Sequence, residues 1–222
     1  GVVHAIRGIN LDLQKGETVA IVGESGSGKS VTMKAAVGLL DSNATINSGE
    51  ILYTYDDGHG QDKTVDLLKL SKKQLRTEYN GQRLAMVFQD PMASLNPRKK
   101  VGDIISEGMD IHHRFANRQE REEKISEMLK KVGLSPEHAA RYPHQFSGGQ
   151  RQRVGIARAL IMNPKLIIAD ECISALDVSI QAQVVNLMKD IQAETQCAYL
   201  FIAHDLSMVK YISDRIGVLH LG

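Results

Sequence analysis

One stretch near the amino terminus is well suited to binding phosphate: Gly23, Glu24, Ser25, Gly26, Ser27, Gly28, Lys29 and Ser30. Its spacing matches the phosphate-binding pattern G-x-x-x-x-G-K-[ST]. The glycines let several backbone N–H groups converge on one anion, and the start of a following helix adds a favourable dipole. Lys29 supplies a cation for the β- and γ-phosphates of a nucleotide, and the Ser30 hydroxyl can ligate Mg²⁺. The run lies between an apolar stretch and a helical one, which makes a ligand-free glycine turn the weaker interpretation.

Two carboxylates, Asp170 and Glu171, directly follow the apolar run 166–169. The end of a buried strand is a costly place for two acids unless a cation or an ordered water compensates. With Mg²⁺ present, Asp170 would hold the metal, and Glu171 would orient and deprotonate an attacking water. The alternative is a pair of solvated acids that cap the next helix, and the phosphate-binding loop in the same chain makes it less favoured.

A third group of residues stands at the start of a helical segment: Ser147, Gly148, Gly149 and Gln150. A serine and two glycines at a helix start form a terminus that can receive an anion. From the physics alone, however, an ordinary helix cap is the better interpretation of this group.

The elements that must position these residues follow from hydrophobic patterning. Continuous apolar runs, typical of strands buried on both faces of a parallel sheet, occupy residues 18–23, 84–88, 166–169, 199–203 and 216–221. Helical patterns occupy 31–40, 118–131 with a terminating Gly133, and the segment after Ser179. This alternation predicts an α/β fold with a mainly parallel sheet.

Two stretches depart from the alternation. Residues 56–63 are polar and contain glycines, which predicts a surface loop. From about residue 91 to 146 strand signals give way to charged, helical sequence, which predicts a helical insertion in the α/β core.

Composition excludes several classes of protein. The 222 residues are 42% hydrophobic and 24% charged, which excludes wholesale disorder and fibrous or low-complexity structure. A formal net charge of +1 gives no global electrostatic reason to bind nucleic acid. Two cysteines are too few for a disulfide framework, and no apolar run approaches the roughly 20 residues of a transmembrane helix.

The three motifs, in this order, resemble those of ATP-binding subunits of ABC transporters, and the resemblance spans essentially the whole chain. Residues 147–150 match the family's signature motif, with Phe146 in place of the usual Leu. The resemblance identifies Gln89 with the family's Q-loop glutamine, residues 174–177, including Asp177, with its D-loop, and His204 with its switch histidine.

The resemblance implies a P-loop NTPase core with an N-terminal antiparallel β portion and an inserted α-helical subdomain. The implied organisation is a single domain over 1–222, with a nucleotide-binding core at 1–89 and 157–222 and a helical signature subdomain at 90–156. The N- and C-terminal parts of the family's full-length subunit are expected to be absent, including an adenine-stacking aromatic residue upstream of Gly1.

Three segments are similar to the oligopeptide and dipeptide importer branch, whose relatives also import nickel. They are residues 87–97, 142–145 and 175–183, and the segment 66–71 also suits that branch. A further position departs from the family: Cys172 stands where proline usually follows the catalytic Glu. We expect hydrolysis to survive this change, and an exposed Cys172 would be a possible oxidation site.

The resemblance also implies a mechanism. ATP would bind the phosphate loop, with Mg²⁺ ligated by Ser30, Gln89 and Asp170. Glu171 would activate water, and Lys29, Gln89 and His204 would complete the catalytic set. Two subunits would sandwich two nucleotides, so that residues 147–150 and Asp177 of one complete the site of the other. Phosphoryl transfer depends on such positioning and charge stabilisation.

The implied partners are a second ATP-binding subunit, integral membrane permease subunits contacting a groove near Gln89, and an extracytoplasmic substrate-binding protein. No direct nucleic-acid partner is expected. The implied location is the cytoplasmic face of the cell membrane, with peripheral attachment. The cargo, and whether the partner subunit is a second copy or a paralogue, stay open.

Two alternatives remain. A nucleic-acid or repair ATPase of the same fold usually carries coiled coils or zinc modules, whereas only 118 residues separate Lys29 from Ser147 and no cysteine cluster is present. A regulatory, weakly hydrolysing half of a heterodimer is disfavoured because both Glu171 and His204 are present.

Overall fold

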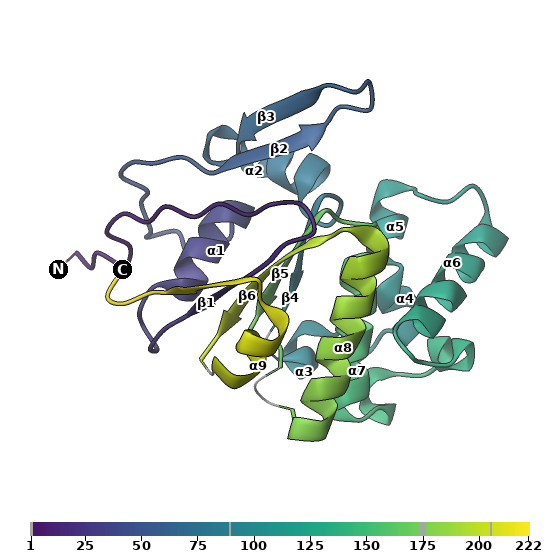
Figure 1. Ribbon diagram of the computed structural model, residues 1–222. Helices are drawn as coiled ribbons and strands as arrows, with labels where there is room; N and C mark the ends of the chain where they lie inside the picture. Colours follow the sequence, from purple (N-terminus) through teal and green to yellow (C-terminus); the bar gives the residue numbers. More distant parts are fainter. Residues whose placement is uncertain (1, 89, 174–175, 205) are drawn as a thin grey trace.

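The computed structural model describes residues 2–88, 90–173, 176–204 and 206–222. Within these ranges, a five-stranded sheet has the order β4-β5-β6-β1-β7, and each neighbouring pair is parallel (Figure 1). Its strands are β1 (Thr18–Val22), β4 (Leu84–Val87), β5 (Leu166–Asp170), β6 (Ala198–Ala203) and β7 (Arg215–Val218). The sheet confirms the predicted parallel α/β fold.

The predicted strands correspond to these five, and only β7 differs appreciably. Its predicted end was residue 221, but strand pairing stops at Val218. Leu219 still donates its N–H to the carbonyl of Val22, yet Leu221 has φ 51°, a left-handed conformation that ends the extended chain. An apolar run therefore continues past the residues that can pair.

The central strands are apolar throughout because both of their faces are covered. Ala20 and Val22 pack into one hydrophobic cluster, while Val19 and Ile21 pack into another on the opposite face. Since side chains alternate along a strand, a run without polar residues fits only a sheet packed on both sides.

Helices cover the sheet and form the insertion (Figure 1). They are α1 (Lys29–Val37), α2 (Lys72–Gln74), α3 (Pro91–Ser94), α4 (Val101–Ile105), α5 (Glu107–His112), α6 (Arg118–Lys131), α7 (Gly148–Leu160), α8 (Val178–Thr195) and α9 (Leu206–Ile212). Short 3-10 turns occupy Leu67–Lys69, Pro136–Ala140 and Pro143–Gln145, and a π-helical turn occupies Leu75–Tyr79. Among the described residues, none of the helices has the length and apolar character needed to cross a bilayer.

The helices begin and end where local chemistry allows. α6 covers the predicted span; the Asn117 side chain accepts the N–H of Glu120 at its start, and Gly133, with φ 75°, lies just beyond its end. α1 begins two residues earlier and ends three earlier than predicted, because Gly28 and Gly38 adopt left-handed conformations at its two caps.

Residues 90–156 are helical and contain no strand in the part that the structure describes, as predicted. The predicted second boundary of this subdomain, between 156 and 157, falls inside α7, which packs against β4 as well as α3, α4 and α6. One helix therefore belongs to both the insertion and the core. The division of the chain into 1–89, 90–156 and 157–222 stays a prediction.

A small antiparallel hairpin stands apart from the main sheet (Figure 1). It consists of β2 (Leu52–Asp56) and β3 (Asp62–Asp66). The predicted loop over 56–63 was too long, because only residues 57–61 form the turn. A contact across the hairpin explains the longer strands: the hydroxyls of Thr54 and Thr64, which face each other, lie 2.7 Å apart. Along β2 itself, the rings of Tyr53 and Tyr55 stack. This hairpin is the antiparallel portion of the fold.

Candidate functional site

The predicted phosphate-binding loop, residues 23–30, joins β1 to α1 at the carboxyl edge of the sheet. Gly26 and Gly28 have φ values of 80° and 99°, which residues with a side chain rarely adopt. A Cβ atom on Gly28 would also lie 2.5 Å from the Ile6 side chain, and one on Gly23 would collide with the carbonyl oxygen of Leu219. The loop conformation thus depends on glycine for both torsional and steric reasons.

Lys29 lies under this loop and is only 4% exposed. Its ammonium donates to the carbonyl oxygens of Gly23 at 2.5 Å and Glu24 at 2.8 Å, and to the hydroxyl of Ser27 at 3.4 Å. A buried cation needs such acceptors to offset its lost hydration. A phosphate oxygen could take the place of one of them, so Lys29 is already positioned for an anion.

Two oxygen ligands from different elements meet beside the loop. The hydroxyl of Ser30, in the first turn of α1, donates to Oδ1 of Asp170, at the end of β5, over 3.4 Å. Hydroxyl and carboxylate oxygens are ligands that Mg²⁺ accepts. In the described part of the chain, no group of three or more His, Cys, Asp or Glu could hold a metal. A Mg²⁺ ion here would need further oxygens from nucleotide phosphates or water, which is its usual mode of binding.

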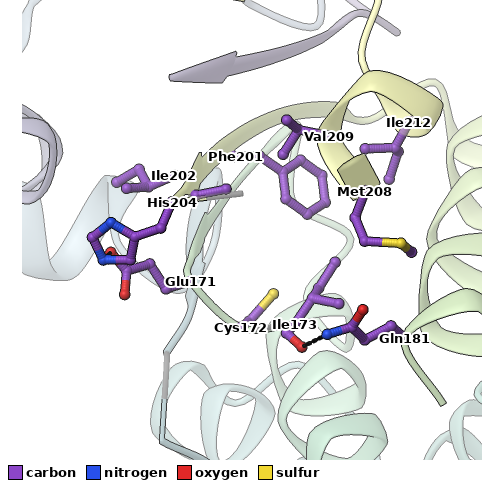
Figure 2. A pocket seen from close by; sticks show the side chains of 11 residues that line it. Glu171, Cys172, Ile173, Gln181, Phe201, Ile202, His204, Met208, Val209 and Ile212 are labelled. Carbon is purple, nitrogen blue, oxygen red and sulfur yellow. Dashed lines mark hydrogen bonds and ion pairs between the residues drawn. The ribbon is translucent and has the colours of Figure 1, made fainter. Parts of the chain in front are cut away.

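Glu171 and His204 form a close pair at the ends of the neighbouring strands β5 and β6. Nε2 of His204 lies 2.6 Å from Oε1 of Glu171, whose side chain is 10% exposed (Figure 2). Glu171 has φ 47°, and its N–H donates to the carbonyl of Ile202 at 2.9 Å. A non-glycine residue in this conformation is strained by roughly 1–3 kcal/mol, and such strain concentrates at functional positions.

The signature residues stand at the start of α7 and use their polar groups locally. The Ser147 hydroxyl accepts the N–H of Gln150 at 3.3 Å, and the Gln150 side chain accepts the N–H of Ser147 at 3.0 Å. The helix-cap interpretation is therefore correct within the chain. Gly149 is required for packing, because a Cβ there would lie 2.6 Å from Cγ2 of Ile180.

The signature motif and the phosphate loop are attached to different parts of the sheet. α7 packs on β4, whereas the loop follows β1, three strands away in the order β4-β5-β6-β1. At about 4.8 Å between neighbouring strands, that separation is about 14 Å. The two anion-receptive features thus belong to separate regions of one chain.

Of the remaining predicted positions, the structure describes Asp177 but not Gln89 or the start of the D-loop. Asp177 is exposed at the N-cap of α8 and makes no capping hydrogen bond with its side chain. Gln89, and Ser174 and Ala175 of the D-loop, lie outside the described residues. The predicted roles of all these residues stay predictions.

Cys172 is buried, with 3% of its surface exposed. Burial raises the pKa of its thiol to about 12, and the Gln152 side chain acts in the opposite direction. The condition under which oxidation was expected, an exposed thiol, is therefore not met. Burial likewise raises the pKa of Cys197 to about 12.

A cavity of about 100 Å³ lies behind the Glu171–His204 pair, between the β5 and β6 ends and the helices α8 and α9 (Figure 2). Its walls are mainly apolar and include Phe201 and Met208. Gln181 also lines it and donates from Nε2 to the carbonyl of Ile173 at 3.1 Å. Sequence reasoning did not single out Gln181 for a role, because nothing in its local pattern marks a polar helix residue that turns toward a loop.

Comparison with known proteins gives consistent matches. A family profile described as ABC transporter matches residues 6–174. The chain is 54% identical, over all 222 of its residues, to the oligopeptide transport ATP-binding protein OppF of Bacillus subtilis and to the dipeptide transport ATP-binding protein DppF of Lactococcus lactis. It spans 68% and 67% of those relatives, about two thirds of their length.

Solved structures are also similar. The dimeric structure of the ATP-binding cassette MJ0796, in a post-hydrolysis state bound to ADP and Pi, has a TM-score of 0.80 and 29% identity. That match covers 99% of this chain and 88% of the other. The structure of cbiO1 from Clostridium perfringens, part of an ABC transporter complex, has a TM-score of 0.76 and 26% identity, covering 99% and 79% of the two chains.

The raised pKa values of Cys172 and Cys197 predict slow thiol chemistry. With pKa values of about 12, the thiolate fraction at pH 8 is about a thousandfold lower than for an ordinary thiol, and burial blocks access as well. We expect neither thiol to react with a chromogenic disulfide reagent at pH 8 until the protein is unfolded, when both should react.

The control for this measurement is Ser42→Cys, which adds a thiol at an exposed position. It should react at once in the native protein. A native thiol of the unaltered chain that reacted as fast would contradict the burial of these side chains.

Proposed function

The chain belongs to the ABC transporter family, and from this premise we propose that it binds ATP with Mg²⁺ and hydrolyses it to power the import of oligopeptides or dipeptides. The observation that carries the proposal is the meeting of three groups at one sheet edge. They are the loop around Lys29, the Ser30–Asp170 contact and the Glu171–His204 pair. The peptide cargo is suggested by the names of the relatives.

In the proposed site, the backbone of residues 23–30 and the ammonium of Lys29 hold the β- and γ-phosphates. Mg²⁺ would be held by Ser30 and Asp170, with Gln89 as a further ligand, and when bound it neutralises charge that builds up on the phosphates. The observed approach of Ser30 to Asp170 supports this assignment, because it brings two hard oxygen ligands together before any metal arrives.

Glu171 is the proposed general base, and His204 is its partner. A carboxylate that is largely buried and fixed by a hydrogen bond is a suitable group to orient water for attack on a phosphate. His204 comes from the adjacent strand end, so its ring can hold the Glu171 carboxylate in place and also reach toward the γ-phosphate. The positive φ of Glu171 turns its side chain out of the strand direction and supports the same role.

A complete site is proposed to require two subunits. Ser147, Gly148, Gly149 and Gln150 would contact the γ-phosphate bound by the partner, and Asp177 would approach the same interface. The separation of about 14 Å between their strand and that of the phosphate loop supports this view, because α7 does not lie beside the loop of its own chain. The similar cassette MJ0796 was solved as a dimer. ATP would then close the dimer, and hydrolysis would release it.

The proposed partners in transport are permease subunits in the membrane and an extracytoplasmic binding protein that delivers the peptide. We place the chain peripherally on the cytoplasmic face of the membrane. The permease would contact the region around Gln89, where the side chain of Phe88 is 40% exposed. α3 follows this point and is tied to α7, because the Arg158 guanidinium donates to the carbonyl of Ser94 at 2.7 Å. A displacement of α3 would therefore be transmitted to α7, the helix that begins with the signature residues.

Glu171→Gln tests the general base. The amide keeps the size of the side chain but cannot accept the proton of water, so ATP binding should persist while hydrolysis is nearly abolished. The measurements are nucleotide binding by calorimetry, phosphate release, and solution mass by light scattering, where ATP and Mg²⁺ should about double the 24.4 kDa mass of the trapped variant.

Glu127→Gln is the matched control, since Glu127 is exposed on α6. It should hydrolyse ATP like the unaltered protein. Normal phosphate release by Glu171→Gln would show that Glu171 is not the base, and a persistent ATP-bound monomer would oppose dimerisation of the chain with itself.

Ser147→Ala tests the composite site. Losing one preorganised donor at a transition state costs about 3–4 kcal/mol, so turnover should fall by a factor of several hundred. Because Ser147 also caps α7, the variant loses roughly 1 kcal/mol of helix stability as well. Steady-state phosphate release and thermal unfolding should be measured together.

Ser71→Ala separates the two effects of Ser147→Ala. Ser71 caps α2 with the same reciprocal arrangement, involving Gln74 in place of Gln150. The variant Ser71→Ala should therefore lose a similar helix cap but keep its turnover of ATP. Equal turnover in the two variants would remove Ser147 from the proposed site.

A cysteine at position 93 tests the permease contact. Ala93 is exposed on α3, and the two native thiols are buried, so Ala93→Cys offers a single reactive site. A photoreactive maleimide attached there should cross-link to a permease subunit in the assembled transporter. Ala44→Cys, which is also exposed, should not. Absence of a product from position 93 in every nucleotide state would contradict the contact.

A further inference from the structure

The chain that leaves β5 must hold Glu171 in a strained position next to His204. Glu171 has φ 47°, and its N–H is bound by the carbonyl of Ile202. Directly after it, Cys172 is buried in the main hydrophobic cluster. The next residue, Ile173, is 8% exposed and belongs to the same cluster, so packing holds one side of it, while the strain at Glu171 favours relaxation of the backbone toward the other side.

Packing supplies little support on the side of α9. The cavity of about 100 Å³ lies there, and Glu171, Cys172 and Ile173 all line it (Figure 2). Atoms that face a void have no dispersion contacts across it, so a small shift of the loop toward the cavity meets no steric barrier. A directional contact must therefore determine where the loop stands.

Gln181 makes that contact. Its Nε2 donates to the carbonyl of Ile173 at 3.1 Å, two residues after Glu171 (Figure 2). The same carbonyl accepts the N–H of Leu176 at 3.1 Å. Of the two bonds, the one from Gln181 connects the loop to a different element, the helix α8.

α8 is anchored by packing, so it can hold the Gln181 donor of this bond in place. Its residues Val184, Val185 and Met188 are all 1% exposed or less, so the helix is anchored in the core one turn beyond Gln181. The N–H of Gln181 donates to the carbonyl of Asp177 at 2.8 Å, which makes Gln181 part of the first turn of the helix. The Gln181 side chain thus connects the first turn of α8, which follows Asp177, to the segment between β5 and α8, here called the catalytic loop.

We propose that Gln181 is a positioning residue that holds Glu171 in its productive place and links it to the N-terminus of α8. The inference rests on the proposed role of Glu171 as the base. A movement of Asp177 at a subunit interface would then be transmitted through the first turn of α8 and the Gln181 amide to the Ile173 carbonyl. Gln181 itself contacts neither nucleotide nor water in this mechanism.

The expected effect is on rate rather than on ATP binding. Misplacement of a catalytic group by about 1 Å can cost on the order of 100-fold in rate. ATP is held by the phosphate loop, which Gln181 does not contact in the hydrogen bonds of the described residues. Gln181→Ala should therefore lower kcat 10- to 100-fold and leave the KM for ATP within about twofold of its original value.

Gln183→Ala is the matched control. Gln183 lies on the same helix and also uses its amide once, accepting from Nη2 of Arg153 at 3.2 Å. Gln183→Ala removes the same kind of side chain and one hydrogen bond from α8, but it leaves the catalytic loop unchanged. Its turnover should stay within about twofold of the unaltered protein, and thermal unfolding should show similar stability for both variants.

Gln181→Glu gives a second variant of nearly the same shape, which keeps the test valid if Gln181→Ala folds poorly. An ionised carboxylate cannot donate to the Ile173 carbonyl and repels it, whereas a protonated carboxyl group can donate. The activity of Gln181→Glu relative to the unaltered protein should therefore be low at pH 7.5 and rise as the pH falls toward 5. A residue needed only for folding would not produce this pH profile.

The last experiment is a double-mutant cycle measured by single-turnover phosphate release. If Gln181 acts through Glu171, adding Gln181→Ala to Glu171→Gln should not lower the residual rate further. A further loss of 10-fold or more would overturn the route through Glu171. Equal kcat values for Gln181→Ala and Gln183→Ala, with Glu171→Gln inactive, would overturn the positioning role alone. Full activity of Glu171→Gln would instead overturn the proposed base, and the inference with it.

Discussion

The common direction of the five main strands is the constraint on which the rest of the structure depends. Because β1, β5 and β6 are parallel neighbours, the chain leaves all three at the same edge of the sheet. The phosphate-binding loop, the acidic pair and His204 are therefore brought together from positions up to about 180 residues apart in the sequence. The apolar strands fix this edge rigidly, since their side chains pack on both faces.

The ionisable groups at this edge all have polar partners within the chain. The buried ammonium of Lys29 is surrounded by three oxygen acceptors, the Asp170 carboxylate accepts from Ser30, and Glu171 is paired with His204. Such compensation is what allows ionisable groups to persist at low exposure. These are also the groups that the proposed site would use to hold a nucleotide and Mg²⁺.

The helices connect this edge to distant parts of the molecule. α7 begins with the signature residues and packs against β4, while α3 is held to it through Arg158. α8 begins directly after its N-cap Asp177 and contacts the catalytic loop through Gln181. Rigid elements with a polar contact at one end are suited to transmit small movements, which the proposed transport cycle requires.

Features that depend on neighbouring residues could be predicted from the sequence. Continuous apolar runs predicted the five parallel strands, helical periodicity and the glycine at 133 predicted α6, and the spacing of residues 23–30 predicted a phosphate loop. These features could be predicted because propensity, capping and loop torsions are local properties. Family resemblance added Gln89, Asp177 and His204, which no local pattern singles out.

The contacts between elements could be seen only in the folded protein. The fold brings Nε2 of His204 within 2.6 Å of Oε1 of Glu171, buries Cys172, and joins the hairpin strands through the hydroxyls of Thr54 and Thr64. It also turns Gln181 toward Ile173. Each of these depends on how residues distant in sequence pack around the loop after β5 and the edges of the sheet. Such packing is a property of the whole core, so it cannot be predicted from a window of a few residues.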